Sequence, residues 1–202
     1  MKHQKRSLFQ NICLLSGTVM LAAALVTLLF WQWNIHASAK AAGEYVHTLR
    51  TLIPEPRGAV PEQRQDNAMA VLSLNGTDFV GILEMPAFDS ALPVGADWGN
   101  ISRYPCCFSG SVYDGSIRIG ATSQPGQYDF FREISVGDSL YFTDMTGNRY
   151  SYVVADIRYT RHADDLTPDS READLTLFIQ NVYAFEYIQI YCKVPGRTVT
   201  TP

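Results

Sequence analysis

An uncharged, mainly apolar run near the N-terminus, residues 12–30, constrains this chain more than any other feature. At about 1.5 Å per residue, a helix of this length crosses a hydrocarbon core of about 30 Å. Residues 1–6 before it are basic, and Trp31 and Trp33 follow it where an interfacial aromatic belt would lie. We therefore expect residues 1–33 to form a cytoplasmic basic tail and a single-pass transmembrane anchor in the cell membrane, with the rest of the chain outside.

A cleaved secretory signal peptide is the alternative interpretation of this segment. Ala37-Ser38-Ala39 resembles the small-residue site at which such peptides are cut. The apolar region of a secretory signal usually spans about 7–15 residues, which is shorter than the run in this chain. The length of the run therefore favours an uncleaved anchor.

The chain beyond the anchor is acidic. All 20 Asp and Glu residues lie there, against 13 of the 16 Lys and Arg residues, which gives this part a net charge of about −7. Such a charge argues against nucleic acid or an anionic lipid surface as a partner. With 202 residues, 47% hydrophobic and 18% charged, we expect one globular domain plus N-terminal appendages.

Residues 34–67 are expected to connect the anchor to this domain. Residues 36–53 are rich in Ala and carry apolar side chains at helical spacing, which predicts a short juxtamembrane helix. Pro54 and Pro56 end that pattern, and the residues that follow have the composition of an exposed linker. The domain itself is expected to span residues 68–202.

Short strand-like segments separated by turn residues fill the domain. Asn75-Gly76 lies between the apolar runs 70–74 and 79–83, and it is the strongest short-range hairpin signal in the chain. Further strands are predicted at residues 117–120, 139–143, 150–157, 175–180 and 187–194. Short strands at this spacing predict an all-β domain folded as a closed or nearly closed β-barrel.

Residues 115–157 and 174–192 resemble the catalytic half of sortases, the membrane-anchored cysteine transpeptidases of Gram-positive bacteria. The matching positions, in order, are Phe130, Phe131, Gly137, Asp138, Thr143, Asp144, Gly147, Tyr150 and Tyr152. Residues 80–87 and 92–94 also resemble the strand that enters the sortase domain and the Leu-Pro-Val that follows it. The resemblance implies a sortase-like barrel on an N-terminal transmembrane helix.

The same resemblance implies that the catalytic residues are missing. Ala121 occupies the position of the catalytic His, Gln180 that of the Cys and Tyr187 that of the Arg, with Gln189 as the alternative to Tyr187. A carboxamide has no useful nucleophilicity, a methyl group has no proton to give, and a phenol lacks the cationic fork of a guanidinium. We therefore expect a degenerate sortase homologue that uses no cofactor.

Three functions remain open at this point. In the first, a peptide groove formed by Gln180, Tyr183, Phe185, Tyr187 and His162 binds sorting-signal-like peptides, segments of pilin or cell-wall proteins, or an active sortase. In the second, Cys106 or Cys107 with His162 forms a relocated active site, so that the protein is a transpeptidase or hydrolase. In the third, the domain is a structural remnant without a ligand.

The resemblance also bears on the cysteines and on metal binding. It places Cys106 just before the strand of the catalytic His and Cys192 at the end of the strand of the Arg, where they form either a disulfide or a pair of buried thiols. The segment 164–174 is acidic, but we interpret it as a solvated loop rather than a Ca²⁺ site. We therefore expect no bound metal.

Overall fold

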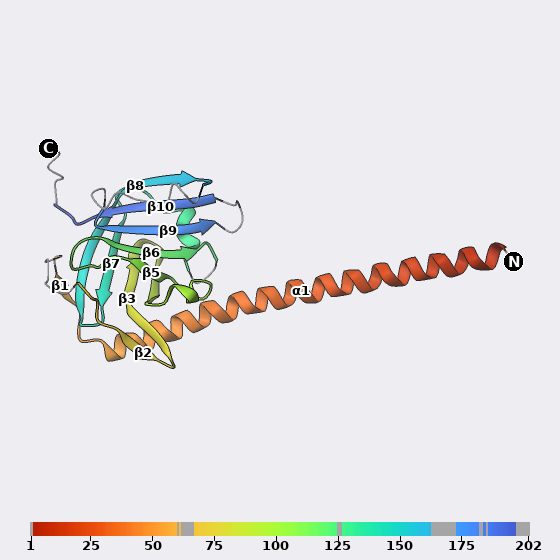
Figure 1. Ribbon diagram of the computed structural model, residues 1–202, viewed down its shortest axis with the longest axis horizontal. Helices are drawn as coiled ribbons and strands as arrows, with labels where there is room; N and C mark the ends of the chain where they lie inside the picture. Colours follow the sequence, from red (N-terminus) through yellow and green to blue (C-terminus); the bar gives the residue numbers. More distant parts are fainter. Residues whose placement is uncertain are drawn as a thin grey trace. The chain divides into compact units, whose positions relative to one another are not determined.

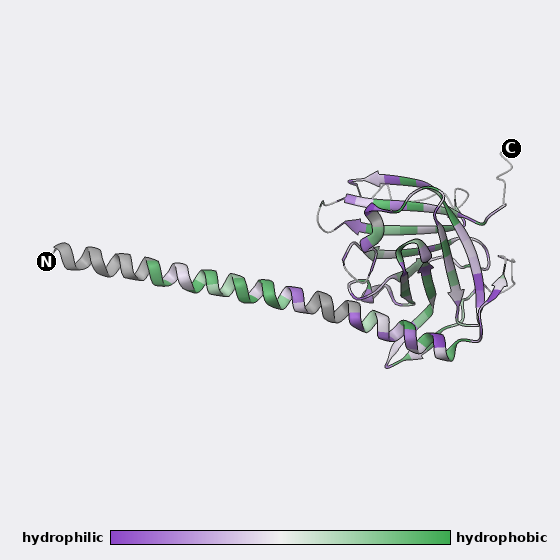
Figure 2. Cartoon of the chain, turned by 180° about the vertical axis from the view of Figure 1, so that it is seen from behind, coloured by the Kyte–Doolittle hydropathy of each residue, from purple (hydrophilic) through white to green (hydrophobic). Residues whose placement is uncertain are grey.

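The computed structural model describes residues 2–59, 61, 67–124, 127–162, 173–181, 184 and 186–196, and their side chains except those of residues 2–13, 34–39 and 131. The chain divides into two compact units, Met1–Ala37 and Ser38–Pro202. Helix α1 (Lys2–Leu52) begins in the first unit and ends in the second. Its segment Leu14–Trp33 is long and apolar enough to span a membrane, and hydrophobic residues dominate it in Figure 2. A signal sequence would have the same properties, so the membrane topology stays a prediction.

Eight strands of the second unit form a closed barrel (Figure 1). The hydrogen-bonded order is β8-β10-β9-β6-β5-β4-β3, and β7 closes the circle because it pairs with both β3 and β8. The strands are β3 (Thr77–Met85), β4 (Ser90–Gly95), β5 (Cys106–Ser109), β6 (Ile117–Thr122), β7 (Ser139–Asp144), β8 (Asn148–Thr160), β9 (Leu175–Asn181) and β10 (Glu186–Lys193). Short 3-10 helices lie between them: η1 (Pro86–Phe88), η2 (Trp98–Asn100) and η3 (Asp129–Arg132). The predicted all-β barrel is confirmed.

The predicted hairpin at Asn75-Gly76 is also confirmed. Strand β2 (Leu72–Leu74) pairs with the start of β3, and only the two turn residues separate the strands. Asn75 has a φ of 51° and Gly76 a φ of 76°, so both adopt the left-handed backbone that a two-residue hairpin of this kind requires.

The juxtamembrane segment differs from its prediction in two respects. Its helix is not a separate short element, because α1 continues without interruption to Leu52. The predicted exposed linker contains β1 (Arg57–Ala59), which pairs in parallel with the start of β8 and so extends the sheet. Local composition did not reveal this strand, since its pairing partner is about 90 residues away in the chain.

The last turns of α1 pack on the outside of the barrel. Val46, Leu49 and Ile53 are buried in a cluster whose other buried members are Phe79, Ile82, Tyr104 and Cys106. Two ion pairs accompany this packing. The Nη2 atom of Arg50 lies 2.6 Å from Glu84 Oε1, and the Nη2 atom of Arg149 lies 2.9 Å from Glu84 Oε2. A segment expected to lie outside the domain therefore covers part of its hydrophobic surface.

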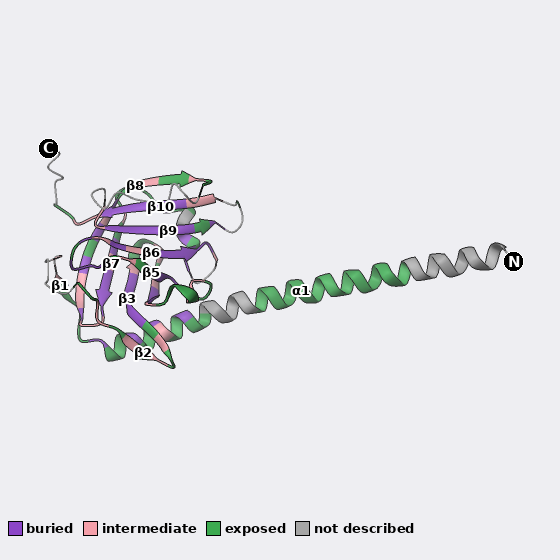
Figure 3. Ribbon diagram, in the orientation of Figure 1, coloured by how far each residue is buried: buried purple, intermediate pink, exposed green. Residues whose placement is uncertain are grey.

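The barrel interior is filled by alternate residues of its strands. Ile117, Ile119 and Ala121 of β6, Leu175, Leu177 and Ile179 of β9, and Ile188, Ile190 and Cys192 of β10 belong to one buried cluster. Figure 3 shows most of β9 and β10 as buried. Because successive side chains of a strand point to opposite faces, the residues between these core positions point out of the barrel. That outward face contains the candidate site.

The packing of α1 can be tested with two leucines that are three residues apart. Leu49→Ala is expected to lower the free energy of unfolding by about 2–5 kcal/mol, because it leaves a cavity in the buried cluster that contains Leu49. Leu52→Ala is the control, with an expected change within about 0.5 kcal/mol, since Leu52 is 55% exposed. Denaturant unfolding of the chain from Ser38 onward measures both. Equal, small effects would contradict the packing.

Candidate functional site

The outward face of β6, β9, β10 and β8, here called the four-strand face, carries three rows of residues in register. The first row is Thr122, Gln180, Tyr187 and Thr160. The second row is Gly120, Phe178, Gln189 and Arg158. The third row is Arg118, Thr176, Tyr191 and Asp156. Residues far apart in the sequence thus become neighbours across strands spaced about 4.8 Å apart.

Gln180 is the exposed centre of the first row, with Thr122 on one side and the half-buried Tyr187 on the other. Thr122 is only 7% exposed, and its hydroxyl is buried with no hydrogen-bond partner in the part of the chain that the structure describes. The backbone around it is well bonded, since the Thr122 N–H donates to Gln127 Oε1 at 2.8 Å and the Ser123 N–H donates to the Gln180 carbonyl at 3.0 Å. A carboxamide, a hydroxyl and a phenol therefore stand side by side.

The structure separates Ala121 from the other two residues of the predicted catalytic set. Ala121 is buried in the barrel core and lies in register with Ile179, which is also a core residue. Its neighbour Thr122 takes the outward position beside Gln180. Sequence reasoning missed Thr122, because only the strand pairing shows which of two adjacent residues faces outward. The assignment of Ala121 to the His position stays a prediction.

The remaining residues of the predicted groove are only partly placed. His162 is exposed two residues beyond Thr160, and its backbone N–H donates to the Thr160 hydroxyl at 3.2 Å. Since Thr160 pairs with Tyr187, His162 follows the end of the first row. Gln189 is buried in the second row. Tyr183 and Phe185 lie outside the described residues.

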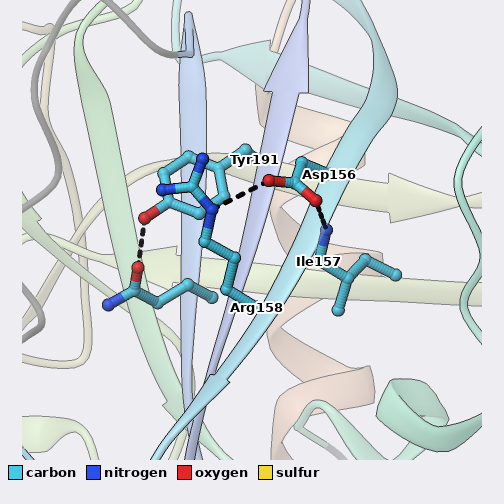
Figure 4. Close-up of polar contacts among 5 residues, drawn as sticks. Asp156, Ile157, Arg158 and Tyr191 are labelled. Carbon is cyan, nitrogen blue, oxygen red and sulfur yellow. Dashed lines mark hydrogen bonds and ion pairs between the residues drawn. The ribbon is translucent and has the colours of Figure 1, made fainter.

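Arg158 and its neighbours form a polar cluster on the second and third rows (Figure 4). The Arg158 guanidinium carbon lies 4.6 Å from the centroid of the Tyr191 ring, and its Nε donates to Asp156 Oδ2 at 2.8 Å. The other Asp156 oxygen accepts from the Ile157 N–H at 2.9 Å. The Tyr191 hydroxyl donates to Gln189 Oε1. A stacked, ion-paired guanidinium is thus held over this part of the face.

An exposed aromatic pair borders the second row at β6. Trp98 is 41% exposed and Phe108 is 58% exposed, and their ring centroids are 5.0 Å apart. The Trp98 ring lies directly over Gly120, where any Cβ atom would clash with it. Glycine at this position therefore allows the aromatic ring to rest on the strand beside Phe178.

Cys106 and Cys192 are free thiols, so the predicted disulfide is not formed. Cys106 packs in the cluster beneath α1, whereas Cys192 packs in the barrel core, so the two thiols lie in different hydrophobic clusters. Alternation of the strands places them on different sides of the barrel wall, which the sequence could not reveal. The alternative of two buried thiols describes the structure.

Burial suppresses the ionisation of all three described thiols. It raises the pKa of Cys107 to about 11, and burial together with the negative charge of Asp97 raises the pKa of Cys106 to about 12. Burial likewise raises the pKa of Cys192. A reactive cysteine needs the thiolate near neutral pH, so these environments oppose nucleophilic catalysis.

The structure does not bring the predicted relocated active site together. Cys106 and Cys107 lie on β5, whereas His162 follows β8. These two strands are on opposite sides of the barrel, four strand steps apart in either direction around it. A general base must reach its nucleophile at about 2.6–3.2 Å or through one water, and this separation is far larger.

The described residues contain no group of three or more His, Cys, Asp or Glu side chains that could hold a metal ion. Most of the acidic segment considered for Ca²⁺, residues 163–172, lies outside the described part of the chain. The metal prediction is therefore untested there.

A cavity of about 180 Å³ lies away from the four-strand face. It is lined by Arg50, Ile53, Pro54, Pro56, Ile82, Glu84 and Thr143. These residues belong to the end of α1, the segment that follows it, β3 and β7. The cavity thus belongs to the helix-packing region and contains none of the residues predicted for the groove.

No protein-family model matches the sequence, and no curated protein matches it. Among solved structures, the chain is similar to sortase A from Corynebacterium diphtheriae, with a TM-score of 0.50, 17% identity, and coverage of 83% of this chain and 87% of that chain. It is also similar to Clostridium perfringens sortase C with the C-terminal cell wall sorting motif, with a TM-score of 0.48, 15% identity, and coverage of 59% of this chain and 72% of that chain. A third similar structure is the complex of Streptococcus agalactiae sortase C1 and MTSET, with a TM-score of 0.47, 18% identity, and coverage of 59% of this chain and 71% of that chain.

The similarity to the Corynebacterium diphtheriae sortase A structure covers most of both chains. Together with the closed barrel described above, it establishes that this protein has a sortase-like fold. At this level of identity the similarity concerns the fold alone, and a fold does not by itself determine function.

The environment of Cys107 predicts its reactivity. Because its pKa is raised from the ordinary 9.0 to about 11, its thiolate fraction at pH 7.5 should be about 100-fold below that of an unperturbed thiol. Alkylation by iodoacetamide, followed site by site with mass spectrometry, should be correspondingly slow in the folded protein and fast after denaturation.

The same shift predicts the pH dependence of stability. Because folding raises the pKa of Cys107, this thiol contributes to the stability of the folded protein below pH 9, and the contribution is lost as the pH rises from about 9 to about 11.

Rapid modification of Cys107 alone at pH 7.5 would contradict the raised pKa of this thiol and would support an active-site thiol.

Proposed function

We propose that the four-strand face binds an extended peptide segment and does not cleave it. The observation that carries this proposal is the exposed carboxamide of Gln180, held between Thr122 and Tyr187 where the sequence resemblance places the sortase nucleophile. A carboxamide both donates and accepts hydrogen bonds, as a peptide group does. It is therefore suited to hold a peptide backbone but not to attack one.

The chemistry of the face favours binding over catalysis. Its three rows contain neither a Cys nor a His side chain among their described members. The Thr122 hydroxyl is buried, so in the centre of the first row the carboxamide of Gln180 and the phenol of Tyr187 are the side-chain polar groups that a ligand can reach. The half-buried ring of Tyr187 adds apolar contact area with a polar tip.

The biological setting is part of the proposal. We place the segment Leu14–Trp33 of α1 in the cell membrane, with the basic N-terminus in the cytoplasm and the barrel outside, as the charge distribution favours. Ligands consistent with a sortase-like fold are sorting-signal-like peptides, segments of pilin or other cell-wall proteins, and an exposed segment of an active sortase.

Gln180 provides the direct test. The full chain in detergent micelles is titrated with fluorescent sorting-signal peptides, and each sample is then examined by mass spectrometry for covalent adducts and cleaved products. Binding without adduct or product is expected. Gln180→Ala should weaken it roughly 2–10-fold, the range for one neutral hydrogen bond of about 0.5–1.5 kcal/mol.

Ser151→Ala is the matched control, because Ser151 is an exposed polar residue of a strand and lies opposite Tyr141 on β7, away from the rows. It should leave the affinity unchanged. Turnover by the unmodified chain would overturn the proposal in favour of an enzyme. Absence of binding to every peptide would favour a structural role instead.

A further inference from the structure

We propose that Arg158 selects peptides that carry a carboxylate about three to four residues from the segment over Gln180. This inference rests on the proposed function and assigns a ligand class to the same face. A guanidinium provides several N–H donors in a planar fork that matches a carboxylate. The ligand group is either an acidic side chain or the C-terminal carboxylate of the peptide.

Arg158 is held in place by its neighbours on the face. One edge of the guanidinium donates to Asp156 at 2.8 Å, and its flat side lies over the Tyr191 ring (Figure 4). The Tyr191 hydroxyl is in turn tied to Gln189, which is in register with Arg158 on the adjacent strand. A cation fixed in this way loses less side-chain entropy when it binds a ligand.

Arg158 is also within reach of a ligand. Its side chain is 51% exposed although the neighbouring Gln189 and Tyr191 are each only 3% exposed. Its charge therefore stands above an otherwise buried part of the second and third rows. The Asp156 side chain beside it is 50% exposed, so a ligand on this part of the face meets the guanidinium together with its paired carboxylate.

The charge of the face differs from that of the chain around it. The described charged side chains of the three rows are Arg118, Arg158 and Asp156, so the face has a formal charge of +1, whereas the chain beyond the anchor carries about −7. Asp156 offsets the charge of Arg158, so the formal charge of +1 corresponds to Arg118 on β6. The face as a whole therefore opposes an anionic ligand less than the surrounding acidic domain does.

The spacing of the strands sets the position of the carboxylate. Arg158 is two strand steps and one row from Gln180. At about 4.8 Å per strand step and about 6.7 Å per row, their backbones are roughly 12 Å apart. An extended peptide rises about 3.3 Å per residue, so this distance corresponds to about three to four residues.

The experiment is a mutant cycle between Arg158 and the charge of the peptide. Binding of a peptide to the full chain in detergent micelles is measured with a Glu placed in turn at each position, with Gln as the neutral counterpart. Each peptide is made with a free and with an amidated C-terminus, which separates the two sources of the carboxylate. At the favoured position, neutralisation should weaken binding to the unmodified chain roughly tenfold or more.

In Arg158→Gln the same neutralisation should have little effect, and Arg158→Lys should restore the charge dependence in part, because Lys keeps the charge but not the fork. Arg161→Gln is the matched control, since Arg161 is exposed just beyond β8 and changes the net charge equally. It should preserve the dependence on peptide charge.

The outcomes separate this inference from the proposed function. Binding that does not depend on peptide charge at any position would overturn the role of Arg158 and leave peptide binding intact. If Arg161→Gln reduced the dependence of binding on peptide charge as much as Arg158→Gln does, the role of Arg158 would also be overturned. The effect would then come from the general electrostatic field of the domain. Absence of binding for every peptide would overturn the proposed function itself. The comparison of peptides on the unmodified chain holds even if an Arg158 variant fails to fold.

Discussion

Closure of the barrel through β7 is the constraint on which the other features of this domain depend. Because β7 pairs with both β3 and β8, the eight strands form a continuous hydrogen-bonded circle with a fixed register. Alternation then sends Ile119 and Ile179 inward and Thr122 and Gln180 outward. A slip of one residue would move the core side chains of a strand to the outer face, so the packed interior also fixes the composition of the outer face.

The described rows of that outer face contain neither a Cys nor a His side chain, although the fold is sortase-like. The described thiols have raised pKa values because of burial, and none of them lies in the row that contains Gln180. The face has hydrogen-bonding, aromatic and cationic side chains instead. Such a set is suited to complementary contacts with a ligand, which is the basis of the proposed binding function.

The end of α1 extends the domain beyond its apparent sequence boundary. Leu49 contributes to a cluster with Phe79 and Tyr104, and Arg50 joins Arg149 on the two oxygens of Glu84. Burial of apolar surface is non-directional, whereas ion pairs of this kind help to orient the helix on the barrel. The domain therefore includes the residues just before the proline-rich segment as structural members.

The sequence alone determined the apolar N-terminal segment, the Asn75-Gly76 hairpin, the strand-rich barrel and the presence of Gln180 at the end of β9, because each follows from local composition, turn chemistry or motif order. Tertiary structure decided which side of each strand faces outward, and so it placed Thr122 rather than Ala121 beside Gln180. It also separated Cys106 from Cys192 and brought Arg158 into register with Gln189. These relations depend on pairing between distant strands, and local sequence does not encode the register at which such strands meet.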